Sequence, residues 1–431
     1  MNGLVGCTSC TVSHLPRARV AAESWSRNQP EAPFVVLLVD GHDWPHDGEP
    51  FEVVLPRELG LSAEELAVQQ GIYDAYELSC ALEPHLLRLL LRRGASAAVF
   101  TDTDTCFYAP VDDLEGLAIE AGVALLPTST RPASVRRYFP ADQIGRRQRM
   151  NGLFNTGLLA VGPSSGEFLD WWIGWLARDC LREASAGMWV DQLWIDWAPV
   201  YFEHLIVRDS SLNVGYWNLD ERELGEIDGR PAIDGAPLRH FHFVGFDPRR
   251  PELLSIYAEE LGDYLRDVLG RDQPPPPSNP VLTRLLRRYS ERLLAAGSEE
   301  LRDRPYGFGV SVHGRPLGPR ERSIYREAVL AAEARDADPP PNPFDPLRGD
   351  EFERLVDDPA SLRSLSSQAR RRLDRMRPSG LSPSSVRRVS RRLLAAAHYA
   401  LTEQAPAELQ VEPRVASDTI RLEYAGAVTA R

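Results

Sequence analysis

The sequence predicts an α/β domain built on a mostly parallel β-sheet flanked by helices, followed by a mainly helical C-terminal region. Two observations predict the domain. Strand-like and helix-like segments alternate up to about residue 161, and the strand-like segments are unbroken apolar runs, which suit strands buried on both faces. Size and composition agree, because 431 residues with 43% hydrophobic content allow two to three domains with a sizeable core.

Each element has its own signal in the order of the chain. Apolar residues recur at helical spacing in the first expected helix, Ser62 to Glu65 forms a capping box that opens another, and Gly94 follows a third as a stop signal. The expected strands are residues 4–7, 33–40, 97–100, 122–127 and 153–161. The expected helices are residues 14–28, the segment opened at Ser62, 77–93, and two Trp-rich segments at 167–183 and 190–202.

A run of four prolines marks the clearest boundary in the chain. Residues 274–277 are all Pro and form a stiff, extended spacer. The sequence therefore predicts an α/β domain over residues 1–273, a linker over 274–280 and a mainly helical accessory region over 281–431. The stretch 363–392 is strongly basic. It is either a nucleic-acid or anionic-lipid patch or, as we expect, a solvated helical face that balances the acidic remainder.

Charge and composition exclude several classes of function. The net charge of −13 argues against nucleic acid or an acidic membrane surface as a partner of the whole chain. All 49 basic residues are Arg, so neither a Schiff-base lysine nor a phosphate-binding lysine is available. We expect no signal peptide, because the start has neither a basic segment nor a long apolar one. We also expect no spanning helix, because no run of about 18 apolar residues exists.

Cysteine usage predicts a reducing, cytoplasmic environment. The five cysteines are an odd number and are scattered along a long chain. Cys7 and Cys10 form a C-x-x-C, but no second pair accompanies them and the first lies in an expected strand. We therefore expect neither a zinc site nor a redox motif there.

Two acidic residues, Asp102 and Asp104, follow the apolar strand at 97–100 directly. Asp is poor strand material, and an unpaired carboxylate at a buried edge is costly. A shared divalent cation explains the pair, because hard cations prefer carboxylate oxygens and often bind substrate phosphates as further ligands. The alternative is a plain turn, since Asp and Thr are common turn residues.

Three later motifs strengthen the metal interpretation. Asn155 is a polar residue within an expected strand, Asp191 and Gln192 open an expected helix, and His242 alternates with Phe in a strand-like segment. Each has a plainer explanation: a turn element, a helix cap and a satisfied core histidine. Neutral imidazole, however, is a good ligand for Mn²⁺ and is seldom used for Mg²⁺.

In their order and spacing these motifs, with Thr8 near the first strand and Asp40 at the end of the second, resemble the GT-A-fold nucleotide-sugar glycosyltransferases. The resemblance is to family 8, the glycogenin- and galactosyltransferase-like group, and covers about residues 4–250. It implies a hexosyltransferase-type enzyme that transfers sugar from a nucleotide-diphosphate donor with retention of configuration. The acceptor, whether a glycan, a protein or a small molecule, is not specified.

The resemblance also implies a role for each matching residue. Asp102, Asp104 and His242 would hold Mn²⁺ or Mg²⁺, with Asp102 also facing the donor. Thr8 and Asp40 would lie near the base and ribose. Asn155, Asp191 and Gln192 would face the sugar and the reaction centre.

One departure from the family concerns the diphosphate. The H-F-x-G block of family 8 usually continues into Lys-Pro-Trp, and its Lys contacts the diphosphate. Here the block is followed by Arg249 and Arg250, which we expect to bind the donor instead. Arg and Lys are not interchangeable at such a site, so the departure indicates a divergent bacterial branch.

Two other interpretations remain open. Haloacid-dehalogenase-like phosphatases also carry D-x-D after a strand, but their pattern requires Thr or Val at the position that Cys106 occupies here. A non-catalytic, transferase-like scaffold with a docking module is the other. Phosphate release from phosphomonoesters would indicate the first, and absence of Mn²⁺ or nucleotide binding the second. The segment 305–325 is rich in aromatic residues and Arg, for which packing is the favoured explanation.

Overall fold

The computed structural model describes residues 3–131, 152–183, 188–257 and 279–361. The chain divides into Met1–Leu362 and Arg363–Arg431, and all described residues belong to the first unit. Most of the predicted linker and the whole basic stretch 363–392 lie outside the described residues. The boundary at 274–280 therefore stays a prediction.

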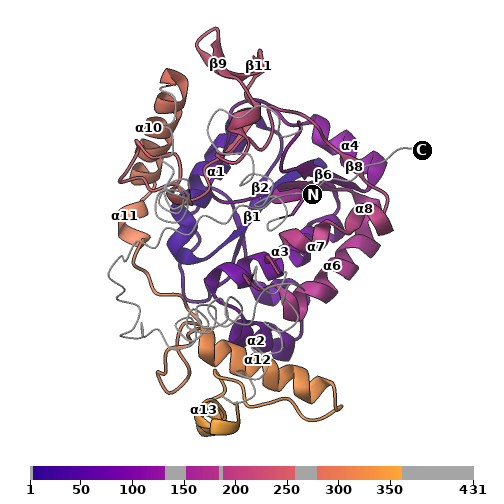
Figure 1. The fold of residues 1–431 in the computed structure, drawn as a ribbon, viewed down its shortest axis with the longest axis vertical. Coiled ribbons are helices and arrows are strands. Elements are labelled where there is room, and N and C mark those ends of the chain that lie inside the picture. Colours follow the sequence, from indigo (N-terminus) through magenta and orange to yellow (C-terminus); the bar gives the residue numbers. More distant parts are fainter. Residues whose placement is uncertain (1–2, 132–151, 184–187, 258–278, 362–431) are drawn as a thin grey trace, which may run out of the picture. The chain divides into compact units, whose positions relative to one another are not determined.

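A seven-stranded mixed sheet forms the centre of the first unit (Figure 1). Its strand order is β3-β2-β1-β4-β7-β6-β8, and β7 alone runs antiparallel to its neighbours. The strands are β1 (Gly3–Cys10), β2 (Phe34–Leu38), β3 (Glu52–Val54), β4 (Ala95–Thr101), β6 (Val123–Pro127), β7 (Phe154–Val161) and β8 (Leu205–Ile206). The predicted fold class, a mostly parallel sheet flanked by helices, is confirmed.

The expected metal ligands lie next to a reversal in the strand order of the sheet. The order of the strands reverses between β1 and β4, which are parallel neighbours. Ligands of open α/β sheets bind beyond the carboxyl ends of the strands at such a reversal. Asp102 follows β4 directly, and the segment after β1 enters the same region, so side chains from both can meet there.

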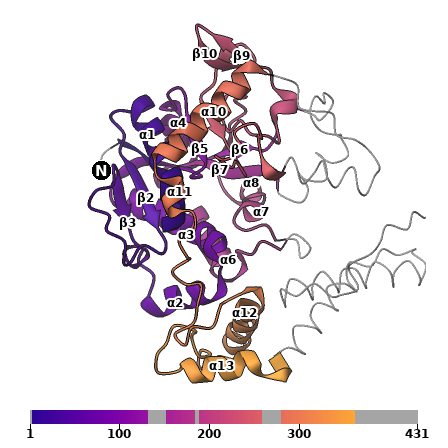
Figure 2. The same ribbon diagram turned by 90° about the vertical axis from the view of Figure 1, so that its left-hand side faces the viewer.

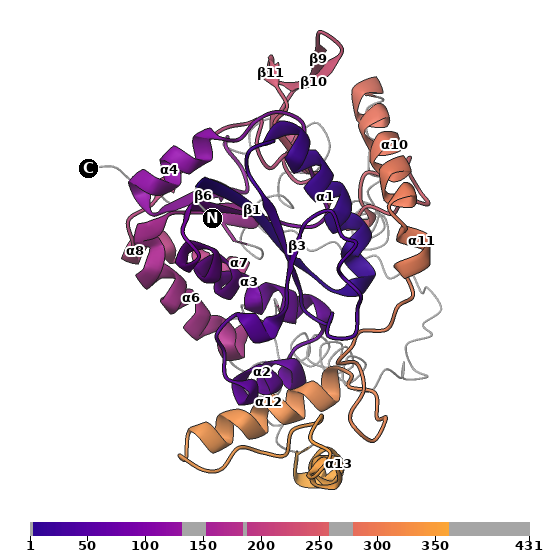
Figure 3. The same cartoon turned by 180° about the vertical axis from the view of Figure 1, so that it is seen from behind.

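Helices cover both faces of the sheet, as Figures 2 and 3 show from two sides. On one face, α1 (Leu15–Asn28) and α4 (Asp113–Ala121) share a core with alternate residues of the strands. On the other, α3 (Ala75–Arg92) packs on β1 and β4, and α6 (Gly166–Asp179) packs on α3. Because strand residues of both faces are buried, the strands read as continuous apolar runs.

Helices after residue 279 pack on the α/β part at two places. α10 (Pro280–Ala295) and α11 (Ser298–Leu301) contact α1, whereas α12 (Pro319–Glu333) contacts α2 (Ala63–Ile72) and α13 (Gly349–Asp357) contacts α12. Arg322 on α12 is buried and donates to the carbonyl oxygens of Gln70 at 2.9 Å and Gly71 at 3.3 Å. The segment 305–325 therefore contains packing residues, as expected. None of the helices in the described ranges combines the length and apolar character needed to cross a bilayer.

The smaller elements complete the described fold. A three-stranded sheet contains β9 (Leu224–Ile227), β10 (Arg230–Ile233) and β11 (Ala236–Pro237). A two-stranded sheet pairs β5 (Thr105–Phe107) with β12 (His240–His242). The short helices are η1 (Val12–His14), η2 (Pro56–Glu58), η3 (Pro163–Ser165), α7 (Gln192–Ile195), α8 (Ala198–Tyr201) and η5 (Leu219–Glu221).

Two expectations about individual elements are wrong. The second Trp-rich helix is not continuous over 190–202, because α7 and α8 are separate. Asp196 between them keeps helical backbone angles, and its carboxylate accepts from the backbone N–H of Leu153 at 2.7 Å, but Pro199 in the first turn of α8 has no N–H with which to continue the helical hydrogen bonds. The first strand is also longer than expected, and Thr8 lies within β1 rather than beyond its end. All five cysteines are free thiols.

Candidate metal centre

Asp102, Asp104 and His242 meet in space and form what we call the Asp–Asp–His cluster. One ligand atom from each residue lies within 4.8 Å of the others. His242 Nε2 is 3.0 Å from Asp104 Oδ1 and 3.3 Å from Asp102 Oδ2. The histidine is buried, whereas the Asp102 side chain is 42% exposed. Ligands of this chemistry suit a divalent cation such as Mn²⁺ that also takes oxygen ligands from a substrate.

Backbone pairing brings these distant residues together. Asp102 and Asp104 lie in the turn between β4 and β5, and the backbone N–H of Asp102 donates to the carbonyl of Gly157 at 3.2 Å. The antiparallel pairing of β5 with β12 sets His242 opposite Thr105. The predicted turn and the predicted metal site are thus the same segment, since the turn holds two carboxylates at the edge of the sheet.

The other ring nitrogen of His242 is held by Asn213, a residue that the sequence did not indicate. Asn213 is buried, and its Oδ1 lies 3.2 Å from His242 Nδ1. When the ring is neutral, a proton on Nδ1 can be donated to this oxygen. The lone pair of Nε2 then faces the carboxylates. Outer-shell contacts of this kind fix the tautomer and orientation of metal-binding histidines. The residues present therefore fit a divalent cation.

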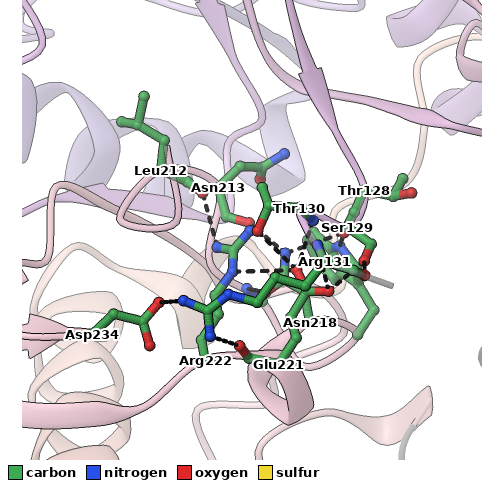
Figure 4. Close-up of polar contacts among 12 residues, drawn as sticks. Thr128, Ser129, Thr130, Arg131, Leu212, Asn213, Asn218, Glu221, Arg222 and Asp234 are labelled. Atoms are coloured by element: carbon green, nitrogen blue, oxygen red, sulfur yellow. Dashed lines mark hydrogen bonds and ion pairs between the residues drawn. The ribbon is translucent and has the colours of Figure 1, made fainter. Parts of the chain in front are cut away.

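The loop that carries Asn213 is held by polar contacts with Asn218 and Arg222 (Figure 4). Asn213 has a φ of +47°, which is uncommon for a residue other than Gly. Its own carbonyl accepts from Asn218 Nδ2 at 3.0 Å, and the carbonyl of Leu212 accepts from Arg222 Nη1 at 3.0 Å. Arg222 is buried, so the strained conformation is held by surrounding structure.

A chain of amide contacts links the cluster to two of the predicted sugar-facing residues. Asn213 Nδ2 donates to Asn155 Oδ1 at 2.8 Å, and Asn155 Nδ2 donates to Gln192 Oε1 at 2.7 Å. A continuous chain of polar contacts therefore runs from α7 to the carboxylates, through Gln192, Asn155, Asn213 and His242. A change at the imidazole can reach the amides through this network.

Charge within the cluster favours a protonated histidine when no cation is bound. Burial opposes the charged ring, but the carboxylates of Asp104 and Asp102 outweigh it and raise the pKa of His242 to about 9. Burial likewise opposes the ionised form of Asp104, but His242 and then Arg17 outweigh it and lower the pKa of Asp104 to about 2. The imidazolium thus bridges the two carboxylates.

Asp191 is buried and does not cap its helix. It precedes α7, but its side chain makes no capping hydrogen bond, and Oδ2 has no hydrogen-bond partner. Burial is the main cause that raises its pKa to about 6, and the charge of Asp102 adds to it. The capping explanation for Asp191 is therefore wrong. A buried carboxylate with a free oxygen is costly and is typical of functional positions.

The two residues expected near the base and ribose are Thr8 and Asp40, and their roles toward a nucleotide stay predictions. Thr8 is buried inside β1, with no hydrogen-bond partner for its hydroxyl. Asp40 accepts from the backbone N–H of Val12 at 2.8 Å through Oδ1 and from that of Gly307 at 3.2 Å through Oδ2. Asp40 therefore joins the end of β1 to the C-terminal segment, and its role toward a nucleotide stays a prediction.

The two arginines expected at the diphosphate contact glutamates. Arg249 Nη2 lies 2.5 Å from Glu299 Oε2, and its Nε also donates to that carboxylate. Arg250 Nε is 3.9 Å from Glu252. A different arginine, Arg17 on α1, lies 3.7 Å from Asp104 Oδ2. The sequence did not single it out.

Comparisons with known proteins give partial likenesses. No family model matches the sequence. The uncharacterized protein YfnD of Bacillus subtilis (strain 168) is 27% identical over 180 residues, which are 40% of this chain and 54% of YfnD. The match thus spans about half the length of that relative.

Two solved structures with fold likeness are both glycosyltransferases. Mouse xyloside xylosyltransferase 1 in its apo form has a TM-score of 0.34 and 11% identity, over 56% of this chain and 97% of that chain. The apo structure of the bifunctional glycosyltransferase WbbM has a TM-score of 0.30 and 14% identity, over 51% and 41% respectively.

Proposed function

We propose that this chain is a metal-dependent glycosyltransferase of the family 8 type, from a divergent bacterial branch. It would move a hexose from a nucleotide-diphosphate donor to an acceptor with retention of configuration. The observation that carries the proposal is the Asp–Asp–His cluster, in which residues 138 positions apart in the chain bring three ligand atoms to one point. Its continuation through Asn213 to Asn155 and Gln192 supports the same function.

The residues of the chain divide the chemistry between them. Asp102, Asp104 and His242 would hold Mn²⁺ or Mg²⁺, and the bound cation would offset the charge that develops on the leaving diphosphate. Asn213 holds the imidazole in the tautomer that leaves Nε2 available. The Asp191 carboxylate and the side-chain amide oxygen of Gln192 would stabilise positive charge on the sugar as the bond between sugar and diphosphate lengthens.

The placement of Asp191 favours this division. Its unpartnered oxygen lies in a buried setting, where the effective dielectric is low and a carboxylate acts strongly on a nearby developing cation. The Asn155 amide, held between Asn213 and Gln192, would orient the Gln192 side chain.

A thermal-shift panel tests the proposal on the full chain. UDP-, GDP-, dTDP- and ADP-sugars are each added with and without Mn²⁺. A ligand at 100 times its Kd stabilises the folded state by about 2.7 kcal/mol, which gives a melting shift of several degrees. We expect one nucleotide class to give this shift in the presence of Mn²⁺ only.

Asp104→Asn should abolish the metal-dependent shift, whereas Asp350→Asn, at a side chain that is 84% exposed on α13, should retain it. Release of nucleoside diphosphate from the stabilising donor would then be measured directly. Absence of any metal-dependent shift across the panel contradicts the proposal, and phosphate release from simple phosphomonoesters would indicate the phosphatase alternative.

A further inference from the structure

The charge balance of the Asp–Asp–His cluster calls for one more cation. Two carboxylates offset the two positive charges of a divalent ion, and a neutral imidazole adds none. A diphosphate that leaves a sugar gains negative charge, and a metal-loaded cluster of zero net charge would offset only part of it. The chain has no Lys to supply one, and phosphate recognition therefore depends on Arg.

Arg17 is placed to meet this need. It lies in the first turn of α1, just beyond β1, and β1 and β4 adjoin where the strand order reverses. Its Nη1 is 3.7 Å from Asp104 Oδ2, and its Nη2 donates to the carbonyl of Phe246 at 2.8 Å. The guanidinium is therefore anchored between the acidic turn and the segment that follows His242.

Arg17 can also accept a ligand. Its side chain is 23% exposed, so it is held by its neighbours but reachable from solvent. A guanidinium has five N–H donors in a planar fork, and the two contacts to Asp104 and Phe246 occupy part of them. The remaining donors suit the paired oxygens of a phosphate.

The Arg249 side chain, by contrast, is 52% exposed and donates from two nitrogens to Glu299, an interaction that joins it to α11. For that guanidinium to bind a phosphate, its bond to Glu299 would have to break. Arg17 pairs with Asp104, which is itself a cluster residue, whereas Arg249 pairs with Glu299.

We propose that Arg17 is a diphosphate-binding residue of this site and has the role that we first expected for Arg249 and Arg250. This rests on the proposed function, because it assigns a residue to the donor that such an enzyme would use. Arg17 binds phosphate oxygens directly while Asp104 binds the cation, and the carbonyl of Phe246 fixes the plane of the guanidinium.

Calorimetric titration of the full chain with inorganic pyrophosphate at saturating Mn²⁺ tests the assignment without knowledge of the base or sugar. The variants are Arg17→Ala and Arg17→Gln, the second of which keeps a donor for Phe246 without the charge. Arg27→Ala is the control, since Arg27 lies on the same helix with a 65% exposed side chain paired to Glu23. Loss of charged hydrogen bonds should weaken pyrophosphate binding about 10- to 100-fold in both Arg17 variants and leave the control unchanged.

Mn²⁺ binding without pyrophosphate, followed by electron paramagnetic resonance, separates phosphate binding from a purely structural role. Removal of the Arg17 guanidinium, a positive charge beside Asp104, should leave Mn²⁺ affinity unchanged or raise it. Wild-type pyrophosphate affinity in both Arg17 variants overturns the assignment, as does a loss of Mn²⁺ affinity as large as the loss for pyrophosphate. If the wild-type chain itself binds neither pyrophosphate nor any nucleoside diphosphate with Mn²⁺, the proposed function fails and the assignment fails with it.

Discussion

Metal binding to the Asp–Asp–His cluster should release one proton, because the imidazole of His242 is charged when the cation is absent. The pKa of this ring is raised to about 9, and a nitrogen must lose its proton before it can bind a metal. Below pH 9 the affinity for Mn²⁺ should therefore rise about tenfold for each pH unit, which amounts to about 100-fold between pH 6.5 and pH 8.5.

Between pH 6.5 and pH 8.5 we expect the protonation of His242 to control the affinity for Mn²⁺. Asp104 is ionised throughout, since its pKa is about 2. His240 on the same strand stays neutral, because burial and then the charge of His242 place its pKa well below the ordinary value. Asp191, with a pKa of about 6, has largely lost its proton at the lower limit of the window.

Calorimetry in two buffers with different ionisation enthalpies measures the protons released per Mn²⁺ bound. We expect close to one proton at pH 7 and a fall toward zero above pH 9. His242→Gln supplies an amide in place of the imidazole and should show weaker binding with no dependence on pH in this window. A wild-type affinity that is constant from pH 6.5 to pH 8.5 would refute the assignment of His242 as a protonated ligand.

Three further changes test the surroundings of the cluster. In Gly157→Ala the new Cβ would lie 2.6 Å from the Nδ1 atom of the cluster imidazole, so Mn²⁺ affinity measured by titration should fall at least tenfold, whereas Gly225→Ala, with open space around it, should bind as wild type. Asp191→Asn removes a buried carboxylate whose pKa is raised to about 6, so the charged form destabilises the folded state above that pH. Urea unfolding should show up to about 3 kcal/mol of added stability for the variant at pH 7.5 and a smaller gain at pH 4, and the sugar transfer that we propose should be lost. Arg322→Ala leaves buried carbonyl groups without donors and should cost about 3 kcal/mol in the same unfolding assay, against a negligible cost for exposed Arg335→Ala.

The residues that the sequence placed well are those whose signal is local. Asp102 and Asp104 interrupt an apolar run, and the run itself fixes the end of β4 within one residue. His242 lies far along the chain, and its assignment came from a resemblance in the order of motifs rather than from periodicity. Its position beside the carboxylates depends on the pairing of β5 with β12, which no local pattern encodes.

The residues that the sequence missed have signals that only tertiary structure reveals. Asn213 lies in a loop, where its positive φ and its contact to His242 have no periodic trace, although Asn is enriched in that conformation. Arg17 occupies a helical segment in which an Arg between apolar residues reads as part of the solvated face. Thr8 was placed beyond the strand because a polar residue suggested its end, but Thr is a good strand former.

The Asp–Asp–His cluster is organised before any cation arrives. An imidazolium on His242 lies 3.0 Å from Asp104 Oδ1 and 3.3 Å from Asp102 Oδ2, so its positive charge holds the two carboxylates close together. Exchange of that proton for a divalent ion would then change chiefly the charge of the cluster. Because Asn213 contacts both His242 and Asn155, the same exchange acts on the amide chain that ends at Gln192. Metal binding at the cluster and the orientation of the Asn155 and Gln192 amides would therefore be coupled through one buried asparagine, and Asn213→Ala should both lower Mn²⁺ affinity and loosen the two amides.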